Sequence, residues 1–197
     1  KVLNLNPMGG LVTTGSDMTV NGVNIGTGGG DITQNTSVGV SSLNSNTTGQ
    51  LNSAFGAGSL QKNMTGSQNT AMGYAALQEN DYGVKNTAVG MNALQATQYK
   101  DNSTAVGFNA LAVNKQSGNT AVGSASLDEV VAGANNTAIG AGAGQKVELG
   151  NNNLLLGYDA QPSATGVSNE VTVGNDDVTK TRLKGEVQTT QDMTVNG

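Results

Sequence analysis

A nine-residue motif, Asn-Thr-Ala-Val-Gly-x-x-Ala-Leu, recurs along this chain, with its clearest copies beginning at Asn69 and Asn86. Its reference glycines recur about every 17 residues, and such a regular period is typical of a solenoid, in which each repeat forms one coil. A single interval, from Gly107 to Gly123, is one residue shorter than the others. The glycines are Gly39, Gly56, Gly73, Gly90, Gly107, Gly123, Gly140, Gly157 and Gly174. Each coil of a solenoid buries its apolar residues only against neighbouring coils.

Two apolar columns emerge when the copies are aligned on the glycine. We expect both to line the interior of the stack, because one coil alone cannot bury them. The column immediately before the glycine contains Val38, Phe55, Met72, Val89, Val106, Val122, Ile139, Leu156 and Val173. The column four residues after it contains Leu43, Leu60, Leu77, Leu94, Leu111 and Leu127.

The polar and small residues also fall into columns. Asparagine tolerates left-handed backbone and caps turns, and stacked amides can hydrogen-bond along the axis. The asparagine column contains Asn35, Asn52, Asn69, Asn86, Asn119, Asn136 and Asn153, with Ser103 once. The glycine column predicts a bend with positive φ or a close backbone approach. The small column predicts tight packing against another surface, such as a second chain; it contains Ala54, Ala71, Ala88, Ala105, Ala121 and Ala138.

The local structure of one coil follows from this pattern. Asn-Thr-Ala-Val predicts a short strand bounded by Asn and Gly. The stretch after the glycine, such as 74–79, fits either one helical turn or a second short strand, and the variable spacers 80–85 and 96–101 read as exposed loops. The predicted fold is therefore all-β, with the option of short helical turns: a parallel β-solenoid or β-roll with coils of about 17 residues, elongated into a homotrimeric fibre.

The chain divides into three parts. Residues 1–34 contain an alternating strand at 17–25 and a glycine-rich connector at 26–30, residues 35–168 form the repeat stack, and residues 169–197 form a closing β segment. The segment 13–22 returns in similar form at 189–197, so a next module is predicted to start there.

The amino-acid composition excludes several classes of function. Aromatic residues make up only 3% of the chain, so the core must be thin and built from small side chains. Charged residues are 12% with a net charge of −5, which gives no reason to expect binding to nucleic acid or to an anionic membrane. The chain has neither Cys nor His, which removes disulfides, the common zinc ligands and the usual general base. No stretch is apolar enough for a membrane span.

The residues that could suggest a site have ordinary structural interpretations. The acidic pairs Asp128-Glu129 and Asp176-Asp177 read as solvated loops rather than as paired catalytic carboxylates. The runs 139–144 and 26–31 lack the context of a nucleotide-binding loop. A threonine column (Thr36, Thr70, Thr87, Thr104, Thr120 and Thr137) is expected in any β-stack. The aromatic residues Tyr74, Phe108 and Tyr158 are expected at contacts between chains. We therefore predict no catalytic, cofactor-binding or metal-binding residue, no cofactor, and no enzymatic activity.

The coils resemble those of bacteriophage tail fibres, including those of cyanophages. The blocks 169–175 and 178–185 are similar to the segment that closes such repeat regions, often upstream of a self-cleaving chaperone domain. More distantly, the coils resemble the shorter coils in the heads of trimeric autotransporter adhesins. Both resemblances imply a parallel homotrimer outside the cell, on a virion tail fibre or a bacterial surface. The tail-fibre resemblance implies a shaft that projects a receptor-binding tip and contacts other fibre or baseplate proteins, and the adhesin resemblance implies binding to a cell-surface glycan or protein.

Overall fold

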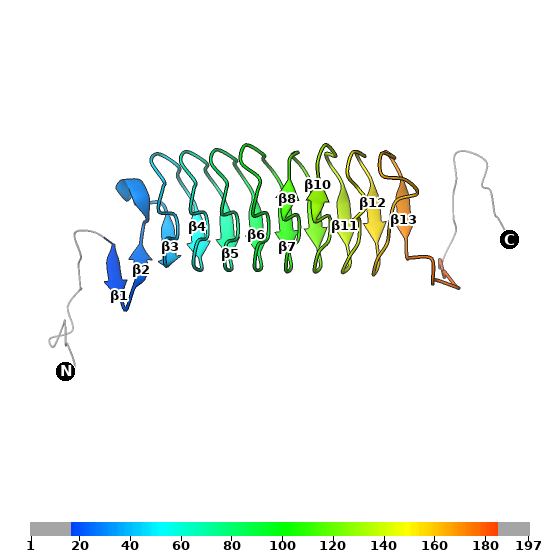
Figure 1. Cartoon of the computed structure of the whole chain (residues 1–197), viewed down its shortest axis with the longest axis horizontal. Helices are drawn as coiled ribbons and strands as arrows, with labels where there is room; N and C mark the ends of the chain where they lie inside the picture. The colour runs from blue at the N-terminus through cyan, green and yellow to red at the C-terminus, as the bar shows by residue number, and fades with distance from the viewer. Residues whose placement is uncertain (1–16, 185–197) are drawn as a thin grey trace.

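The computed structural model describes residues 17–184 and shows one elongated parallel β-solenoid (Figure 1). Eight parallel strand pairings give about eight turns. Equivalent residues of successive repeats lie opposite each other in the sheet, as Ala71 and Ala88 do. The coils therefore stack in columns, and each column has one member per repeat. The strands are β3 (Thr36–Gly39), β4 (Ser53–Phe55), β5 (Thr70–Met72), β6 (Thr87–Val89), β7 (Thr104–Val106), β9 (Thr120–Val122), β11 (Thr137–Ile139), β12 (Leu154–Leu156) and β13 (Val171–Val173).

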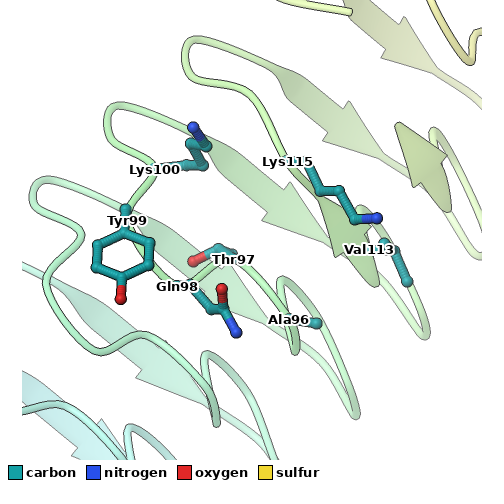
Figure 2. Close-up of a pocket in the computed structure, with 7 residues that line it drawn as sticks. All are labelled: Ala96, Thr97, Gln98, Tyr99, Lys100, Val113 and Lys115. Atoms are coloured by element: carbon teal, nitrogen blue, oxygen red, sulfur yellow. The ribbon is translucent and has the colours of Figure 1, made fainter. Parts of the chain in front are cut away.

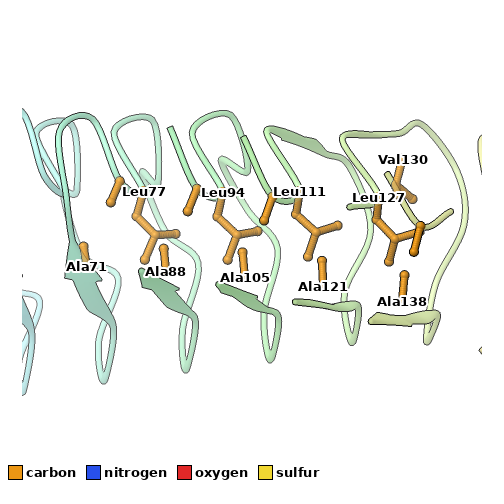
Figure 3. Packing of buried hydrophobic residues seen from close by; sticks show 14 of the residues in the cluster. Ala71, Leu77, Ala88, Leu94, Ala105, Leu111, Ala121, Leu127, Val130 and Ala138 are labelled. Carbon is orange, nitrogen blue, oxygen red and sulfur yellow. The ribbon is translucent and has the colours of Figure 1, made fainter. Parts of the chain in front are cut away.

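The interior contains the leucine column and the alanine column. The six leucines are fully buried, as predicted, and the six alanines facing them are also fully buried. Figure 3 shows Leu94 and Leu111 above a row of alanines that includes Ala105. The small column therefore packs tightly, as predicted, but against the interior of its own chain rather than against a second chain.

The column before the glycine lies outside the core, which contradicts the prediction. Phe55, Met72 and Ile139 are 37%, 49% and 45% exposed. Side chains alternate between the two faces of a strand, so alanine and its neighbour cannot both point inward. The two inner columns share one narrow space: alanine faces leucine in most coils, and where Gly144 takes the leucine position, Leu155 is fully buried in the alanine column.

In most coils the segment after the glycine is a run of turns, and within residues 17–184 no helical turn forms there. The second short strand, the other predicted option, forms at the end of the segment in two coils, as β8 (Val113–Asn114) and β10 (Glu129–Val130). Ala75 and Leu77 have φ angles of 54° and 51°, between residues with ordinary negative φ. The Ala75 N–H donates to the Ala57 carbonyl of the preceding coil at 3.0 Å, whereas Leu77 donates to the Ala93 carbonyl of the following coil at 3.0 Å. Left-handed backbone costs a leucine roughly 1–2 kcal/mol. Burial of its side chain offsets this with about 1.5–3 kcal/mol.

The predicted asparagine ladder is present, in a side-chain-to-backbone form. The Asn69 Oδ1 accepts from the backbone N–H of Asn86 in the next coil at 2.9 Å, and its Nδ2 donates to the Gly83 carbonyl at 2.8 Å. The sequence interpretation missed a second, amide-to-amide ladder, in which Asn63 Nδ2 donates to Asn46 Oδ1 at 2.9 Å. Successive members of this second column are Asn46, Asn63, Asn80, Thr97, Asn114, Val130 and Val147, all buried. Every buried side-chain polar atom within residues 17–184 has a partner.

The reference glycines meet both predicted requirements. Gly73 has a φ of 138°, and a Cβ placed on it would lie 2.5 Å from the carbonyl oxygen of Gly90 in the next coil. The bend after each strand therefore requires glycine for its backbone angle and for the distance between coils.

The N-terminal end is a hairpin that covers the first coil. β1 (Met18–Val20) and β2 (Val23–Gly26) are antiparallel, and β2 pairs antiparallel with β3. The single strand predicted at 17–25 is wrong, because Asn21 and Gly22 both have positive φ and form the tight turn that this dipeptide favours.

The glycine-rich run after the hairpin is packed rather than a loose connector. Its last two residues begin the 3-10 turn η1 (Gly29–Asp31), and the Gly29 backbone N–H donates to the Leu43 carbonyl at 2.9 Å. The Asp17 carboxylate accepts from the backbone of Thr27 at 2.7 Å and of Gly28 at 2.8 Å. This arrangement closes the first core leucine from solvent, as terminal caps do in repeat proteins.

The C-terminal end continues the ladder into β13. Glu170 takes the place of asparagine, and its backbone N–H donates to Asn153 Oδ1 at 3.0 Å. The Ser163 hydroxyl and backbone N–H hold the pKa of the Glu170 carboxyl below its ordinary value. The repeated segment 189–197 lies outside the described residues.

Candidate functional site

The two acidic pairs lie apart in the structure. Glu129 is exposed on β10 (Glu129–Val130), a short strand parallel to β8 (Val113–Asn114), while Asp128 is half-buried. Asp176 and Asp177 follow the last strand, three coils further along the axis or roughly 14 Å at β spacing. Paired carboxylates that hydrolyse glycosides are about 5–9.5 Å apart across a cleft, and these pairs do not meet that geometry.

Asp128 carries an electrostatic cost that a substitution can remove. Partial burial, and then the neighbouring Glu129, raise the pKa of the Asp128 carboxyl above its ordinary value of 3.8. A raised pKa means that the folded state disfavours the charged form, so the cost is absent below pH 3.8 and grows as pH rises through the folded pKa. We expect Asp128→Asn to raise the melting temperature at pH 7 by up to about 2 °C, since partly exposed groups contribute little.

Thermal unfolding of Asp128→Asn followed by circular dichroism at pH 3 and pH 7 tests this. The gain in melting temperature should vanish at pH 3, where the Asp128 carboxyl is protonated in the folded and the unfolded state. Asp177→Asn, at an exposed carboxylate three coils away from Asp128, is the matched control and should leave the melting temperature unchanged. A loss of stability at pH 7 in Asp128→Asn would contradict the assignment.

The glycine-rich run 139–144 is part of the coil. Gly140 is the reference glycine, and Gly142 and Gly144 have φ angles of 68° and 75° at the two positions that are left-handed in the other coils. Within residues 17–184 the one helical element is η1, so no helix follows either glycine-rich run as a nucleotide-binding loop requires. The threonine column lies in register on the outer face of the main sheet.

A row of exposed apolar side chains flanks the glycine bend, and we call it the apolar corner. It joins the column before the glycine to the residue after it, where Tyr74, Phe108 and Tyr158 are 60%, 49% and 73% exposed. Its exposed members are Val40, Phe55, Met72, Tyr74, Met91, Val106, Phe108, Val122, Ile139, Tyr158 and Val173. The corner therefore runs along the whole stack.

A pocket interrupts the loop face, and the sequence interpretation missed it. It has a volume of about 330 Å³ and is lined by Ala96, Thr97, Gln98, Tyr99, Lys100, Val113 and Lys115 (Figure 2). We call it the Tyr99 pocket. The Tyr99 ring stacks on Tyr82 of the preceding coil, with centroids 5.0 Å apart and planes at 6°. The one signal in the sequence was the single shortened interval, between Gly107 and Gly123.

A second hollow, of about 490 Å³, lies at the C-terminal end between the turn around Gln161 and the residues after β13. Its lining is mostly polar and includes Lys146, Asp159 and Asp176. Among residues 17–184, no three acidic side chains gather closely enough to hold a metal ion. The same part of the chain contains no helix with the length and apolar character to cross a membrane.

The fold assigns the chain to the class of parallel β-solenoid repeat proteins. No protein-family model, curated protein or solved structure matches it.

Proposed function

We propose that this chain is a non-catalytic structural segment of an extracellular fibre, a phage tail fibre or a similar surface fibre, whose stacked coils project a receptor-binding tip. The observation that carries the proposal is the apolar corner. Contiguous exposed apolar surface of this extent marks an interaction site in soluble proteins. A shaft that has to resist bending gains by burying such a surface along its whole length.

The period of the corner favours a second copy of the same chain as the occupant. Its side chains repeat once per coil, at about 4.8 Å along the axis. An identical stack aligned in parallel presents the same period, so each coil meets the same coil of its neighbour. A globular partner lacks that period and would cover only a few coils.

The shape of the corner favours three chains over two. Its two columns lie on either side of the glycine bend, and they comprise residues such as Met72 before the bend and Tyr74 after it. In a parallel homotrimer each chain touches two neighbours around the axis, and each column can serve one neighbour. The loops that hold Tyr82 and Tyr99 then remain available on the outside for other fibre proteins or a cell-surface receptor.

Light scattering on the purified protein tests this proposal. We expect a mass of three copies of the 19.7-kDa chain. The double variant Met72→Glu/Val106→Glu should yield the mass of one chain, because it places like charges where the copies meet.

Val131→Glu/Leu149→Glu is the matched control, since Val131 and Leu149 are 43% and 52% exposed but lie away from the corner. It should remain trimeric. A parent protein that runs as a single chain at micromolar concentration would refute the fibre proposal.

The alternative is the head of a trimeric adhesin that binds a cell-surface glycan or protein. The coding sequence around this segment discriminates the two. A downstream self-cleaving chaperone domain supports the tail fibre, and a C-terminal membrane anchor supports the adhesin.

A further inference from the structure

We propose that the Tyr99 pocket binds a small acidic saccharide, with the sugar ring on the face of Tyr99 and its carboxylate paired with Lys115. This goes beyond the role of a shaft, and it holds whether or not the chains associate, because one chain supplies the whole pocket.

The pocket exists because one coil is a residue short. Ala96 bridges to Val113, one full repeat further along the chain. The backbone N–H of Asp101 donates to the Ser117 hydroxyl at 3.0 Å, and this partner is one residue short of a full repeat. The missing residue therefore falls between 113 and 117, in the loop that follows Tyr99 along the axis. A regular coil would place a side chain over Tyr99 there, and the shortened coil leaves a hollow. Such a hollow adds no contact between coils, so the role of a shaft does not explain it.

Tyr99 supplies an apolar surface that is held in place. Tyr82 stacks on it from the preceding coil, while Val113 and Lys115 come from the following coil, so the pocket lies on the side of Tyr99 away from Tyr82. Tyr99 is 60% exposed despite this stacking. An aromatic ring fixed in this way presents its face to the C–H groups of a pyranose at little cost in conformational entropy.

The charges around the pocket favour an anion. The chain carries a net charge of −5, yet the charged side chains in the lining are two lysines and no carboxylate. The ion pair within residues 17–184 joins Lys62 to Glu79 at 2.7 Å, in a different coil. The nearest acidic neighbour in sequence, Asp101, uses Oδ1 to accept from the backbone N–H of Val84 at 2.8 Å. Glu129, the strand partner of Val113 in the following coil, is exposed and does not line the pocket.

The size and the remaining lining favour a sugar. The volume of about 330 Å³ lies near the lower limit of small-molecule pockets, about 300 Å³, so one sugar residue suits it better than a long chain. In Figure 2 Thr97 and Gln98 lie between Tyr99 and Lys115. The Thr97 hydroxyl is buried and donates to Asn80 Oδ1 at 3.2 Å, so the exposed Gln98 amide is the polar group that faces a ligand. The pocket thus offers an aromatic face, a polar side chain and a positive charge. A sugar acid has the matching groups: an apolar ring face, hydroxyl groups at the ring edge and a carboxylate.

Titration with a dimer of galacturonic acid tests the proposal, with the neutral galactose dimer as the comparison probe. The chain has no tryptophan, so its intrinsic fluorescence comes from four tyrosines, of which Tyr82 and Tyr99 form the stack and Tyr74 and Tyr158 give a constant background. We expect saturable quenching by the acidic dimer. Its affinity should fall as salt rises from about 0.05 to about 0.5 M, because screening weakens the lysine contacts.

Two substitutions localise the site. Saturation-transfer NMR on the sugar serves as the readout, because Tyr99→Ala removes a reporter ring. Lys115→Gln should weaken binding of the acidic dimer about fivefold, as a partly exposed ion pair does. Tyr99→Ala should weaken it about tenfold.

Tyr158→Ala and Lys146→Gln, at an exposed tyrosine and a lysine of other coils, should bind as the parent does. The corner variant Met72→Glu/Val106→Glu should do the same, so the fibre proposal and this one can fail separately. The proposal is overturned if the acidic dimer does not bind, if the neutral dimer binds equally well, or if both pocket substitutions leave the affinity unchanged.

Discussion

Ala88→Asp is expected to destroy the cooperative folding of the central coils. Ala88 is fully buried on β6, between Ala71 and Ala105 of the adjacent strands, and the column contains no cation. A carboxylate there loses its hydration without gaining a partner, which costs about 3–5 kcal/mol. Domains are stable by only about 5–15 kcal/mol, so the loss should be visible as a large drop in melting temperature.

The neighbouring residue provides the control. Val89 lies on the same strand but on the outer face and is half-buried. Val89→Asp should change the free energy of unfolding by only about 0.5 kcal/mol. Both substitutions should be compared in the background Phe55→Glu/Ile139→Glu, which places charges in the apolar corner on strands that do not pair with β6 and so separates folding of the chain from association. Thermal unfolding followed by circular dichroism measures the fall in melting temperature for each variant. A larger fall for Val89→Asp than for Ala88→Asp would show that the alanine column is not the core.

Gly73→Ala is the second substitution with a large expected effect. The added methyl group would lie 2.5 Å from the carbonyl oxygen of Gly90 and 2.7 Å from its carbonyl carbon. Both atoms belong to the backbone of the next coil, which cannot rotate away. Because φ is 138° as well, strain of about 1–3 kcal/mol adds to overpacking of about 1–3 kcal/mol.

Gly166→Ala is the matched control, because no atom lies within 4 Å of a Cβ built on Gly166. It should leave stability unchanged or raise it by about 0.4–1 kcal/mol through a smaller unfolded-state entropy. Urea unfolding of the two variants gives the comparison. Equal midpoints would mean that the coils are not in backbone contact at the reference glycines.

The period predicted the solenoid, but it could not decide which apolar column faces inward. We assigned the larger side chains of the Val89 column to the interior, whereas Ala88 occupies it. Both columns are apolar and adjacent, so periodicity alone is equally satisfied by either assignment. A usable signal was the spread of volumes. The inner column is small in most coils, while the outer one ranges from valine to phenylalanine, as an unconstrained surface position does.

The turns and the Tyr99 pocket depend on contacts that one sequence does not display. Nothing in the motif indicates that Leu77 adopts left-handed backbone, because its burial against other coils offsets the local preference. The Tyr82–Tyr99 stack was implicit in two tyrosines that are separated by one repeat. The pocket beside it needed the further knowledge of where the shortened coil loses its residue.

The interruptions in the asparagine columns give the shaft a mechanical weak point. Thr97 and Ser103 stand in one coil at positions where other coils carry asparagine, and the Ser103 hydroxyl accepts from Asn114 instead of extending the ladder. The stability of a solenoid is a sum of interfaces between adjacent coils, so its strength under load is that of its weakest interface. A fibre pulled along its axis would part first at this coil. The capped N-terminal block and the C-terminal block, in which Val130 and Val147 replace the amides, would separate as two units.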